Sequence, residues 1–191
     1  MGTLDFYESN AEEYCDTTFD IDVSENRGIF LNLLEKGSSI LDLGCGSGRD
    51  AKAFADEGMI VTAVDGSPAM CRIAARNTRS EVRNLKFSEL DFEDEFDGVW
   101  ACASLLHVPM GELPGVLSSV NRSLRKWGLF FCCFKKGFGE RTDSGRHYTD
   151  MLPNQLSDVL SSNGFLPVRI WESEGMDGTV WVNSISRKAE I

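Results

Sequence analysis

The sequence of 191 residues predicts an α/β fold, in which a mainly parallel sheet is covered by helices on both faces. Residues 38–43 and 59–64 are short, apolar and rich in β-branched side chains, and each is followed by Gly or Asp, as buried parallel strands often are. Between them, residues 49–57 place apolar side chains on one face of a helix that Gly58 would end. Strand, helix and strand in this order define one βαβ unit.

The same alternation continues to the end of the chain, and turn residues separate the segments. Further helices are predicted at 68–77, 112–126 and 153–162, and further strands at 85–87, 96–103, 129–134, 165–171 and 179–186. Only a short turn, Gly175 to Gly178, separates the last two strands, so we expect an antiparallel hairpin at the edge of the sheet.

Charge and cysteine content exclude several classes of protein. The chain has 30 Asp and Glu residues against 19 Lys and Arg, and its net charge of -11 repels nucleic-acid backbones and anionic membrane surfaces. The six cysteines show neither a CxxC pair nor zinc-ligand spacing, which favours reduced thiols and no metal. Because there is no signal peptide and no apolar run of about 18 residues, we expect a cytoplasmic monomer or homodimer with no nucleic-acid or membrane partner.

A glycine-rich turn follows the first predicted strand. Gly44, Gly46 and Gly48 form a GxGxG pattern that lets a ligand approach the backbone and the free N–H groups of the next helix. The dinucleotide fingerprint is GxGxxG, and its third glycine would fall at Arg49. A phosphate loop would need a Gly-Lys-Ser/Thr ending, which is absent. The spacing therefore disfavours both an NAD(P)-dependent oxidoreductase and a nucleoside triphosphate site.

Two acidic residues accompany this turn. Asp42 lies near the end of the first strand, where its carboxylate would attract an ammonium group and repel a phosphate. Asp65 follows the second strand, where a carboxylate can accept two hydrogen bonds from a ribose diol. The alternative for Asp65 is an N-terminal cap of the helix that begins at Pro68. A ligand with a ribose and a cationic amino-acid tail would satisfy both acids.

These residues belong to a wider set of motifs. The segments ILDLGCGSGRD (40–50), VTAVDGSPAM (61–70) and FDGVWACASLLHVP (96–109) resemble the motifs of class I S-adenosylmethionine-dependent methyltransferases. Within that family, the chain is similar to small bacterial members of the tellurite-resistance and quinone types. The resemblance implies a three-layer, doubly wound, Rossmann-like sheet of seven strands with the last strand antiparallel.

The resemblance also implies a cofactor and the residues that bind it. S-adenosyl-L-methionine would give up its methyl group and leave as S-adenosyl-L-homocysteine. Gly44 and Gly46 would lie against its methionine part, while Asp42 would reach its amino group and Asp65 its ribose. The residues implied to bind the cofactor are Asp42, Gly44, Cys45, Gly46, Asp65, Gly66, Met70, Leu90, Asp91, Phe92 and Ala103. Core packing is the alternative for Met70, which the resemblance places beside the adenine ring together with residues 90–92.

The likeness covers one domain, 1–191, with an N-terminal helical lid region in 1–36 and an αβ core in 38–191. In the lid region, Tyr7 and Tyr14 are seven residues apart and would share one helical face, where they could contact the substrate. Packing of these two aromatic side chains within the lid itself is the alternative.

His107 follows the fourth predicted strand and would face the region of methyl transfer. The ordinary pKa of histidine suits a general base that takes a proton from the acceptor. We therefore expect His107 to contact the substrate and to be the catalytic residue. The alternative is a histidine that orders the loop before Pro109.

One segment of the acidic chain, residues 135–148, is basic and rich in glycine. It follows the fifth predicted strand and would cover the acceptor site. There, Arg141 and Arg146 could bind a carboxylate or another oxyanion, and Tyr148 could add a hydroxyl. A solvated segment with no ligand role is the alternative.

The function predicted from these motifs is transfer of a methyl group from S-adenosylmethionine to a small-molecule acceptor, which could be anionic, by direct in-line displacement. Residues 103–106 lack the Asn or Asp, Pro-Pro and aromatic pattern of enzymes that methylate DNA bases. The alternatives are a non-catalytic S-adenosylmethionine-binding protein and, third, an NAD(P)-dependent oxidoreductase.

Overall fold

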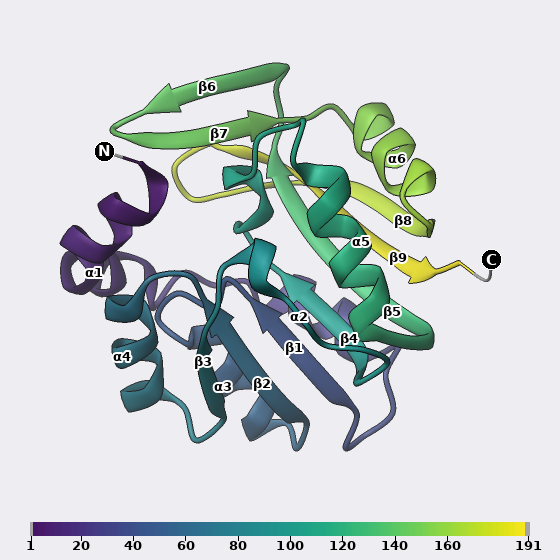
Figure 1. Ribbon diagram of the computed structural model, residues 1–191, viewed down its shortest axis with the longest axis horizontal. Helices are drawn as coiled ribbons and strands as arrows, with labels where there is room; N and C mark the ends of the chain where they lie inside the picture. The colour runs from purple at the N-terminus through teal and green to yellow at the C-terminus, as the bar shows by residue number, and fades with distance from the viewer. Residues whose placement is uncertain (1, 190–191) are drawn as a thin grey trace.

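The sheet of the protein has seven strands in the order β3-β2-β1-β4-β5-β9-β8 (Figure 1). The computed structural model describes residues 2–189, so Met1, Glu190 and Ile191 of the predicted domain lie outside the described residues. Neighbouring strands are parallel except for β9, which is antiparallel to both β5 and β8. The strands are β1 (Ser39–Leu43), β2 (Ile60–Asp65), β3 (Glu81–Asn84), β4 (Phe96–Ala101), β5 (Leu124–Lys135), β8 (Phe165–Glu174) and β9 (Val180–Lys188). The predicted doubly wound sheet with an antiparallel last strand is confirmed.

Helices cover both faces of this sheet, which gives the three layers of the predicted fold. The helices are α1 (Thr3–Thr18), α2 (Ser24–Leu31), α3 (Arg49–Asp56), α4 (Pro68–Asn77), α5 (Leu113–Ser123) and α6 (Pro153–Ser162). The helices α5 and α6 pack on one face, and α2, α3 and α4 on the other. The first helix, α1, packs beside α4 (Figure 1).

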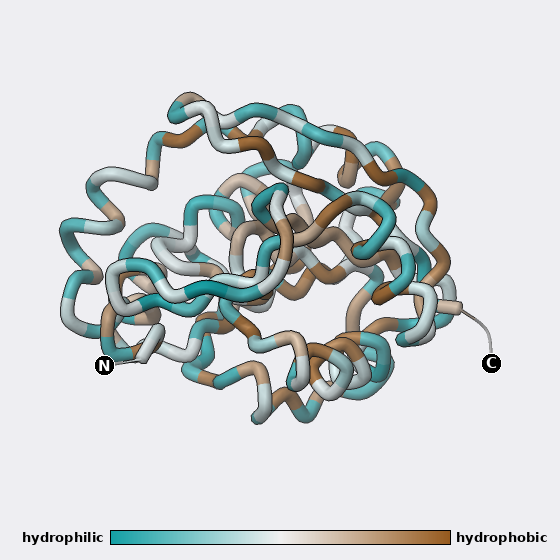
Figure 2. Tube along the Cα trace, turned by 90° about the horizontal axis from the view of Figure 1, so that it is seen from above, coloured by the Kyte–Doolittle hydropathy of each residue, from teal (hydrophilic) through white to brown (hydrophobic). Residues whose placement is uncertain are grey.

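Strand β5 shows how the core is divided between the two faces. Phe130 and Phe134 are buried on the side of α5 and α6, whereas Phe131 is buried on the other side, because successive side chains of a strand point to opposite faces. Phe131 stacks on Trp100 of β4 with 3.9 Å between ring centroids, and Phe30 of α2 packs on both rings. Figure 2 shows the apolar stretches (brown) in the middle of the molecule and the hydrophilic ones (teal) around them. This core fixes the carboxyl ends of β1, β2 and β4 relative to one another.

The predicted strand at 85–87 is wrong. The strand that pairs with β2 is β3, and residues 87–89 form a short 3-10 helix. Pairing stops where Asn84 of β3 meets Asp65, the last residue of β2, so the apolar side chains that follow have no partner strand and pack on the core instead. The true strand carries charged side chains on an exposed edge, which an apolar pattern does not reveal.

The predicted helix at 112–126 is too long. α5 ends at Ser123, and Leu124 begins β5 by pairing with Phe96 of β4. Leu124 also fits the apolar period of the helix, so spacing alone cannot place the boundary. A bulge follows at Trp127, whose φ is 66°, before regular pairing with β4 resumes.

The basic, glycine-rich segment contains a hairpin, although no strand is predicted there. β6 (Gly139–Asp143) and β7 (Arg146–Asp150) form a separate two-stranded antiparallel sheet. Ser144 and Gly145 in its turn have φ of 52° and 80°, the left-handed values that tight two-residue turns require. In Figure 1 the hairpin lies above the end of β5, near the start of α1. The segment is therefore an ordered part of the fold rather than a loop.

Among residues 2–189, no helix is both long and apolar enough to cross a membrane. The six cysteines are all free in the described part of the chain.

Candidate active site

The turn that joins β1 to α3 lies at the carboxyl end of the sheet and is built from glycines with left-handed backbone angles. Gly44, Gly46 and Gly48 have φ of 76°, 53° and 77°, a region that other residues enter only with strain. A Cβ on Gly44 would collide with the Cβ of Ser104. The Ser104 hydroxyl donates a hydrogen bond to the carbonyl of Leu43 at 2.6 Å. Glycine is required at position 44 because the loop after β4 packs directly on the turn.

Asp65 closes the turn from the end of β2. Its carboxylate accepts hydrogen bonds from the N–H groups of Gly46 (3.0 Å) and Ser67 (2.9 Å), and burial raises the pKa of the carboxyl above its ordinary value. The cap of α4 is Ser67, whose Oγ accepts the Met70 N–H at 3.2 Å, so capping does not require Asp65. A Cβ on Gly46 would meet no described atom within 4 Å. Asp65 therefore lies beside a turn whose outer side is open.

Asp42 lies below the same turn, on the side of β1 that faces α3. Its side chain is buried, with the residue 3% exposed, and within residues 2–189 its Oδ2 has no hydrogen-bond partner. Burial, followed by repulsion from Asp50, raises the pKa of the Asp42 carboxyl well above its ordinary value. A buried carboxylate oxygen without a donor is costly. Oδ2 of Asp42 can therefore accept a hydrogen bond from a cationic ligand group.

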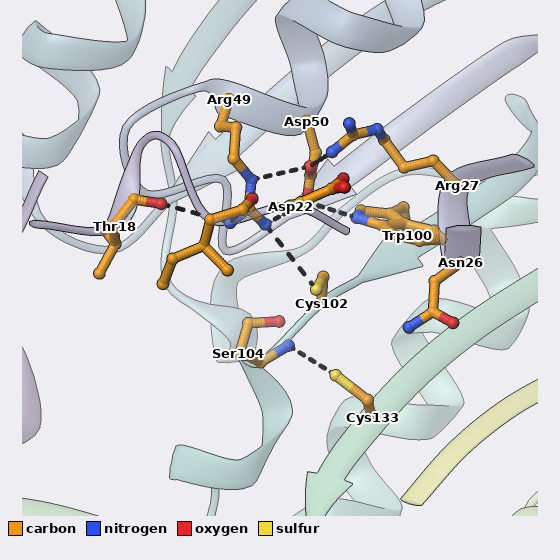
Figure 3. A network of polar contacts seen from close by, with 12 residues as sticks. Thr18, Asp22, Asn26, Arg27, Arg49, Asp50, Trp100, Cys102, Ser104 and Cys133 are labelled. Atoms are coloured by element: carbon orange, nitrogen blue, oxygen red, sulfur yellow. Dashed lines mark hydrogen bonds and ion pairs between the residues drawn. The ribbon is translucent and has the colours of Figure 1, made fainter. Parts of the chain in front are cut away.

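Asp50, a second buried acid beside Asp42, is by contrast well paired (Figure 3). It accepts hydrogen bonds from Arg27 (2.6 Å), from the guanidinium of Arg49 (3.0 and 2.9 Å) and from the indole N–H of Trp100 (2.9 Å). Burial acts to raise the pKa of the Asp50 carboxyl, but the bonds and charge of Arg49 outweigh it and hold that pKa below its ordinary value. This network, which was not predicted, joins α2, α3 and β4 under the turn. The Arg-Asp pair directly after the glycines is the signal that could have indicated it.

We expect Asp42→Asn to stabilise the protein. The folded state holds the Asp42 proton more tightly than the unfolded chain, so ionisation of Asp42 costs stability as the pH rises above the ordinary carboxyl pKa. Asparagine removes that cost, and the free energy of unfolding at neutral pH should rise by about 1 kcal/mol. Urea unfolding at several pH values measures this difference, which should shrink at low pH as Asp42 of the wild type protonates. A difference that is the same at every pH would contradict the assignment of a buried charge.

The residues predicted to flank an adenine ring differ in their surroundings. Met70, Leu90 and Phe92 are buried, whereas Asp91 is exposed. Phe92 packs edge-on against Phe96, with 5.1 Å between ring centroids. The burial of Met70 agrees with core packing, which is the alternative given for this residue. A role of all four residues in ligand binding stays a prediction.

Three further predicted residues lie at the ends of adjacent strands. Cys45 follows β1, and its N–H donates to the Val64 carbonyl of β2 at 2.9 Å. Gly66 follows β2, and a Cβ there would lie 2.9 Å from Leu4 of α1. Ala103 follows β4 with a left-handed φ of 51°. Because β1 lies between β2 and β4 in the sheet, the structure brings these predicted residues to one edge.

α1 docks on α4 at this same edge. Glu8 accepts hydrogen bonds from the Ala69 N–H (2.8 Å) and the Ser67 hydroxyl (2.7 Å), and these bonds lower the pKa of its carboxyl. An ion pair between Arg76 and Glu12, at 2.9 Å, adds a second contact. Glu8 thus caps a helix to which it does not belong. Sequence reasoning missed it, since a cap supplied from a distant segment leaves no local pattern.

Tyr7 of α1 contacts His107, which lies in the loop after β4. The Tyr7 hydroxyl is 2.8 Å from His107 Nε2, and His107 Nδ1 is 2.7 Å from the carbonyl oxygen of His147 on β7. A carbonyl can only accept, so Nδ1 carries the proton and Nε2 accepts from Tyr7. Burial lowers the pKa of His107 to about 4, which keeps the ring neutral. The ring of Tyr14 lies edge-on to Tyr7 at 5.1 Å, across the kink that α1 makes at Asn10.

Arg141 and Arg146, both predicted to bind an oxyanion, have different surroundings. Arg141 lies over the ring of Tyr148 and pairs with two carboxylates at 2.8 and 3.8 Å. Arg146 lies 4.4 Å from the ring centroid of Phe6 and 5.4 Å from that of Tyr148. Its Nε is buried and, in the part of the chain that the structure describes, has no hydrogen-bond partner. The charge of Arg141 is therefore already balanced, and that of Arg146 is not.

The chain matches a family model described as a methyltransferase domain over residues 40–128. A ubiquinone biosynthesis O-methyltransferase of Coxiella burnetii is 34% identical over 80 residues, which cover 39% of this chain and 34% of that protein. The corresponding enzyme of Pasteurella multocida is 25% identical over 122 residues, which cover 49% of this chain and 50% of that protein. The chain thus spans a third to a half of the length of these curated relatives.

Solved structures share the whole fold. The 1,6-didemethyltoxoflavin-N1-methyltransferase of Burkholderia thailandensis, solved with 1,6-didemethyltoxoflavin and S-adenosylhomocysteine bound, has a TM-score of 0.85 at 25% identity and covers 97% of this chain and 87% of its own. A TehB-like methyltransferase of Corynebacterium glutamicum has a TM-score of 0.74 at 18% identity. The match covers 94% of this chain and 98% of that protein, and it shows the same fold.

Fold, motifs and these matches agree on one class of protein: residues 40–128 match a methyltransferase domain, and the chain as a whole is similar in fold to S-adenosylmethionine-dependent methyltransferases. The likeness to methyltransferases, with quinone-type and TehB-like proteins among the matches, was predicted from the motifs and is confirmed. The family model ends at Gly128, so α1 and the β6–β7 hairpin lie outside the matched region.

Proposed function

We propose that this chain binds S-adenosyl-L-methionine at the turn after β1 and transfers its methyl group to a small-molecule acceptor. The observation that carries the proposal is Oδ2 of Asp42, a buried carboxylate oxygen that lacks a partner within residues 2–189 and lies next to the glycine turn and Asp65. A ligand with an ammonium group and a ribose diol offers a partner to each acid, whereas a phosphate would be repelled. The residues present therefore fit this cofactor.

The turn and the two acids would hold the cofactor in complementary ways. Asp42 would accept from the ammonium group of the amino-acid tail, and Asp65 from the ribose hydroxyls. Gly44 and Gly46 allow close approach to the backbone, because neither carries a side chain. Bound S-adenosylmethionine supplies a methyl group on a sulfonium whose leaving group is a neutral thioether. What remains for the protein is to align the acceptor and exclude water.

We assign to α1 the role of excluding water from the site. Glu8 links α1 to α4 by a hydrogen bond with the Ser67 hydroxyl, and Tyr7 links it to His107 in the same way. The Thr3 hydroxyl accepts a hydrogen bond from the His147 N–H at 2.9 Å. These contacts come from three different elements, so α1 is held over the carboxyl ends of the strands. His107, neutral and bonded through Nε2 to the Tyr7 hydroxyl, ties α1 to the loop after β4.

The acceptor that we propose is a small molecule. The Burkholderia relative is described with 1,6-didemethyltoxoflavin, and the Coxiella relative by its part in ubiquinone biosynthesis. In this chain, α1 and the β6–β7 hairpin converge on His107 from two sides, which favours a small acceptor enclosed between them over a macromolecule on an open face.

Two measurements test the proposal. In calorimetric titrations, S-adenosylhomocysteine should bind to the purified protein and NADH should not, because the glycine spacing and Asp42 disfavour a pyrophosphate. With methyl-labelled S-adenosylmethionine, a panel of phenols, quinols, amines, thiols and N–H heterocycles should yield at least one labelled product. Binding of NADH without binding of S-adenosylhomocysteine would contradict the proposed site, and binding without transfer to any acceptor would contradict the proposed reaction.

A further inference from the structure

We propose that Arg146 binds the methyl acceptor as a planar anion, an ionised phenol, enol or cyclic imide, next to the rings of Phe6 and Tyr148. The inference rests on the proposed function and names the chemical class of its acceptor. Four features of the region around Tyr148 support it.

The first feature is a partly buried cation that has no counter-charge. Nε of Arg146 is buried and has no acceptor among the described residues, and the partner of its guanidinium is the neutral hydroxyl of Tyr7. The nearest acid along the hairpin is Asp143, which is opposite Arg146 in register, but Asp143 pairs with Arg141 at 3.8 Å and accepts the Ser144 hydroxyl at 3.0 Å. A partly buried charge gains from a counter-charge, and an anionic ligand would supply the one that Arg146 lacks among the described residues.

The second feature is the local sign of charge. Nζ of Lys135 lies 4.9 Å from the ring centroid of Tyr148 and 5.9 Å from that of Trp181, and no carboxylate within residues 2–189 pairs with it. Lys135 and Arg146 therefore place two positive charges near one ring, neither of them in an ion pair within residues 2–189, in a chain whose net charge is -11. Such a local field attracts an anion although the protein as a whole repels one.

The third feature is the shape that the surrounding rings favour. Phe6 and Tyr7 come from α1, His107 from the loop after β4, and Tyr148 from β7. Their ring centroids are separated by 5.4 Å for Phe6 and Tyr7, 5.5 Å for Tyr7 and His107, and 4.9 Å for His107 and Tyr148. Flat rings beside a flat guanidinium favour a planar ligand, and the guanidinium can bind two acceptor atoms of such a ligand at once.

The fourth feature is the state of His107. Its Nε2 already accepts from Tyr7, and its Nδ1 donates to the His147 carbonyl. The titratable and charged groups that face the ring are Tyr7 from α1, Lys135 from β5, and Arg146, His147 and Tyr148 from β7. None of them is a carboxylate, so no counter-charge is present for a protonated ring. An acceptor that arrives as its anion needs no proton removed: it supplies the electron pair of the new bond to carbon, while the pair of the broken bond leaves with sulfur.

The test uses the full chain saturated with S-adenosylhomocysteine and two probes of similar size, 4-nitrophenolate and the neutral 4-nitroaniline. The wild type should bind the anion at least about tenfold more tightly than the neutral probe, and Arg146→Gln should remove this preference. Arg146→Lys should recover part of it, because lysine keeps the charge but not the planar fork. Arg169→Gln is the matched control: Arg169 also lies over a ring, that of Trp171 at 4.8 Å, but on β8, and this variant should keep the full preference.

Absorbance gives a second readout, since 4-nitrophenol changes colour when it ionises. Bound to the wild type it should ionise at a lower pH than in buffer, and bound to Arg146→Gln at a higher pH than on the wild type. Thermal unfolding shows that each variant is folded. Equal affinity for the two probes, or no binding of 4-nitrophenolate by protein that does bind S-adenosylhomocysteine, would overturn the inference and leave the proposed function intact. Failure of S-adenosylhomocysteine itself to bind would instead overturn the proposed function.

Discussion

Asp65→Ala is expected to lower the affinity for S-adenosylhomocysteine by roughly 100-fold or more. The carboxylate can accept from both hydroxyls of a ribose, and each hydrogen bond to a charged acceptor contributes about 1.5 to 3 kcal/mol. Alanine also releases the N–H groups of Gly46 and Ser67, which loosens the turn itself. Calorimetric titration of the folded variant measures the loss.

Two further variants test whether the loss of affinity is specific to the carboxylate of Asp65. Asp56→Ala removes an exposed acid of α3 that pairs with Lys52, and it should bind like the wild type. Asp65→Asn keeps one acceptor oxygen at nearly unchanged volume, so its affinity should lie between those of the wild type and Asp65→Ala. If folded Asp65→Ala bound as tightly as the wild type, the ribose would have to lie elsewhere.

Gly46→Ala should lower cofactor affinity at least about tenfold while costing only about 1 kcal/mol of stability. The backbone of Gly46 is left-handed, with φ of 53°, which alanine tolerates at a modest cost. The new methyl group would meet no described atom within 4 Å, so it is free of protein clashes and would occupy the space that we assign to the ligand. Urea unfolding and calorimetry separate the two effects.

Gly37→Ala is the matched control for this substitution. Gly37 has φ of 83°, and a Cβ there would likewise meet no described atom within 4 Å, but it lies in the turn before β1, at the other end of that strand. The variant should show a similar loss of stability and no loss of affinity. Equal affinities for Gly46→Ala and Gly37→Ala would show that the ligand does not approach the turn after β1.

Elements with strong local signals could be predicted from the sequence. The helices at 68–77 and 153–162 are confirmed to the residue. Each begins with a proline, which suits the first position of a helix because its missing N–H would have no partner there. The positions of Asp42 and Asp65 could also be predicted, since the ends of parallel strands meet at one edge of a sheet.

Contacts between distant segments could not be predicted. Asp50 is paired by Arg27 from a different helix, and Glu8 caps α4 from α1, but neither contact has a spacing that could reveal it. The two candidate arginines show the same limit. Arg141 and Arg146 are the same residue type in one hairpin, and only the folded side-chain contacts pair Arg141 with carboxylates and leave Arg146 without an ion pair within residues 2–189.

The central claim is that the carboxyl ends of β1 and β2 hold the cofactor, and a crystal structure of the complex with S-adenosylhomocysteine tests it most directly. We expect the amino group of the ligand within hydrogen-bond distance of Asp42, directly or through one water, its ribose hydroxyls on Asp65, and its backbone contacts at Gly44 and Gly46. A ligand bound elsewhere, with Oδ2 of Asp42 still lacking a partner, would contradict the assignment of the site.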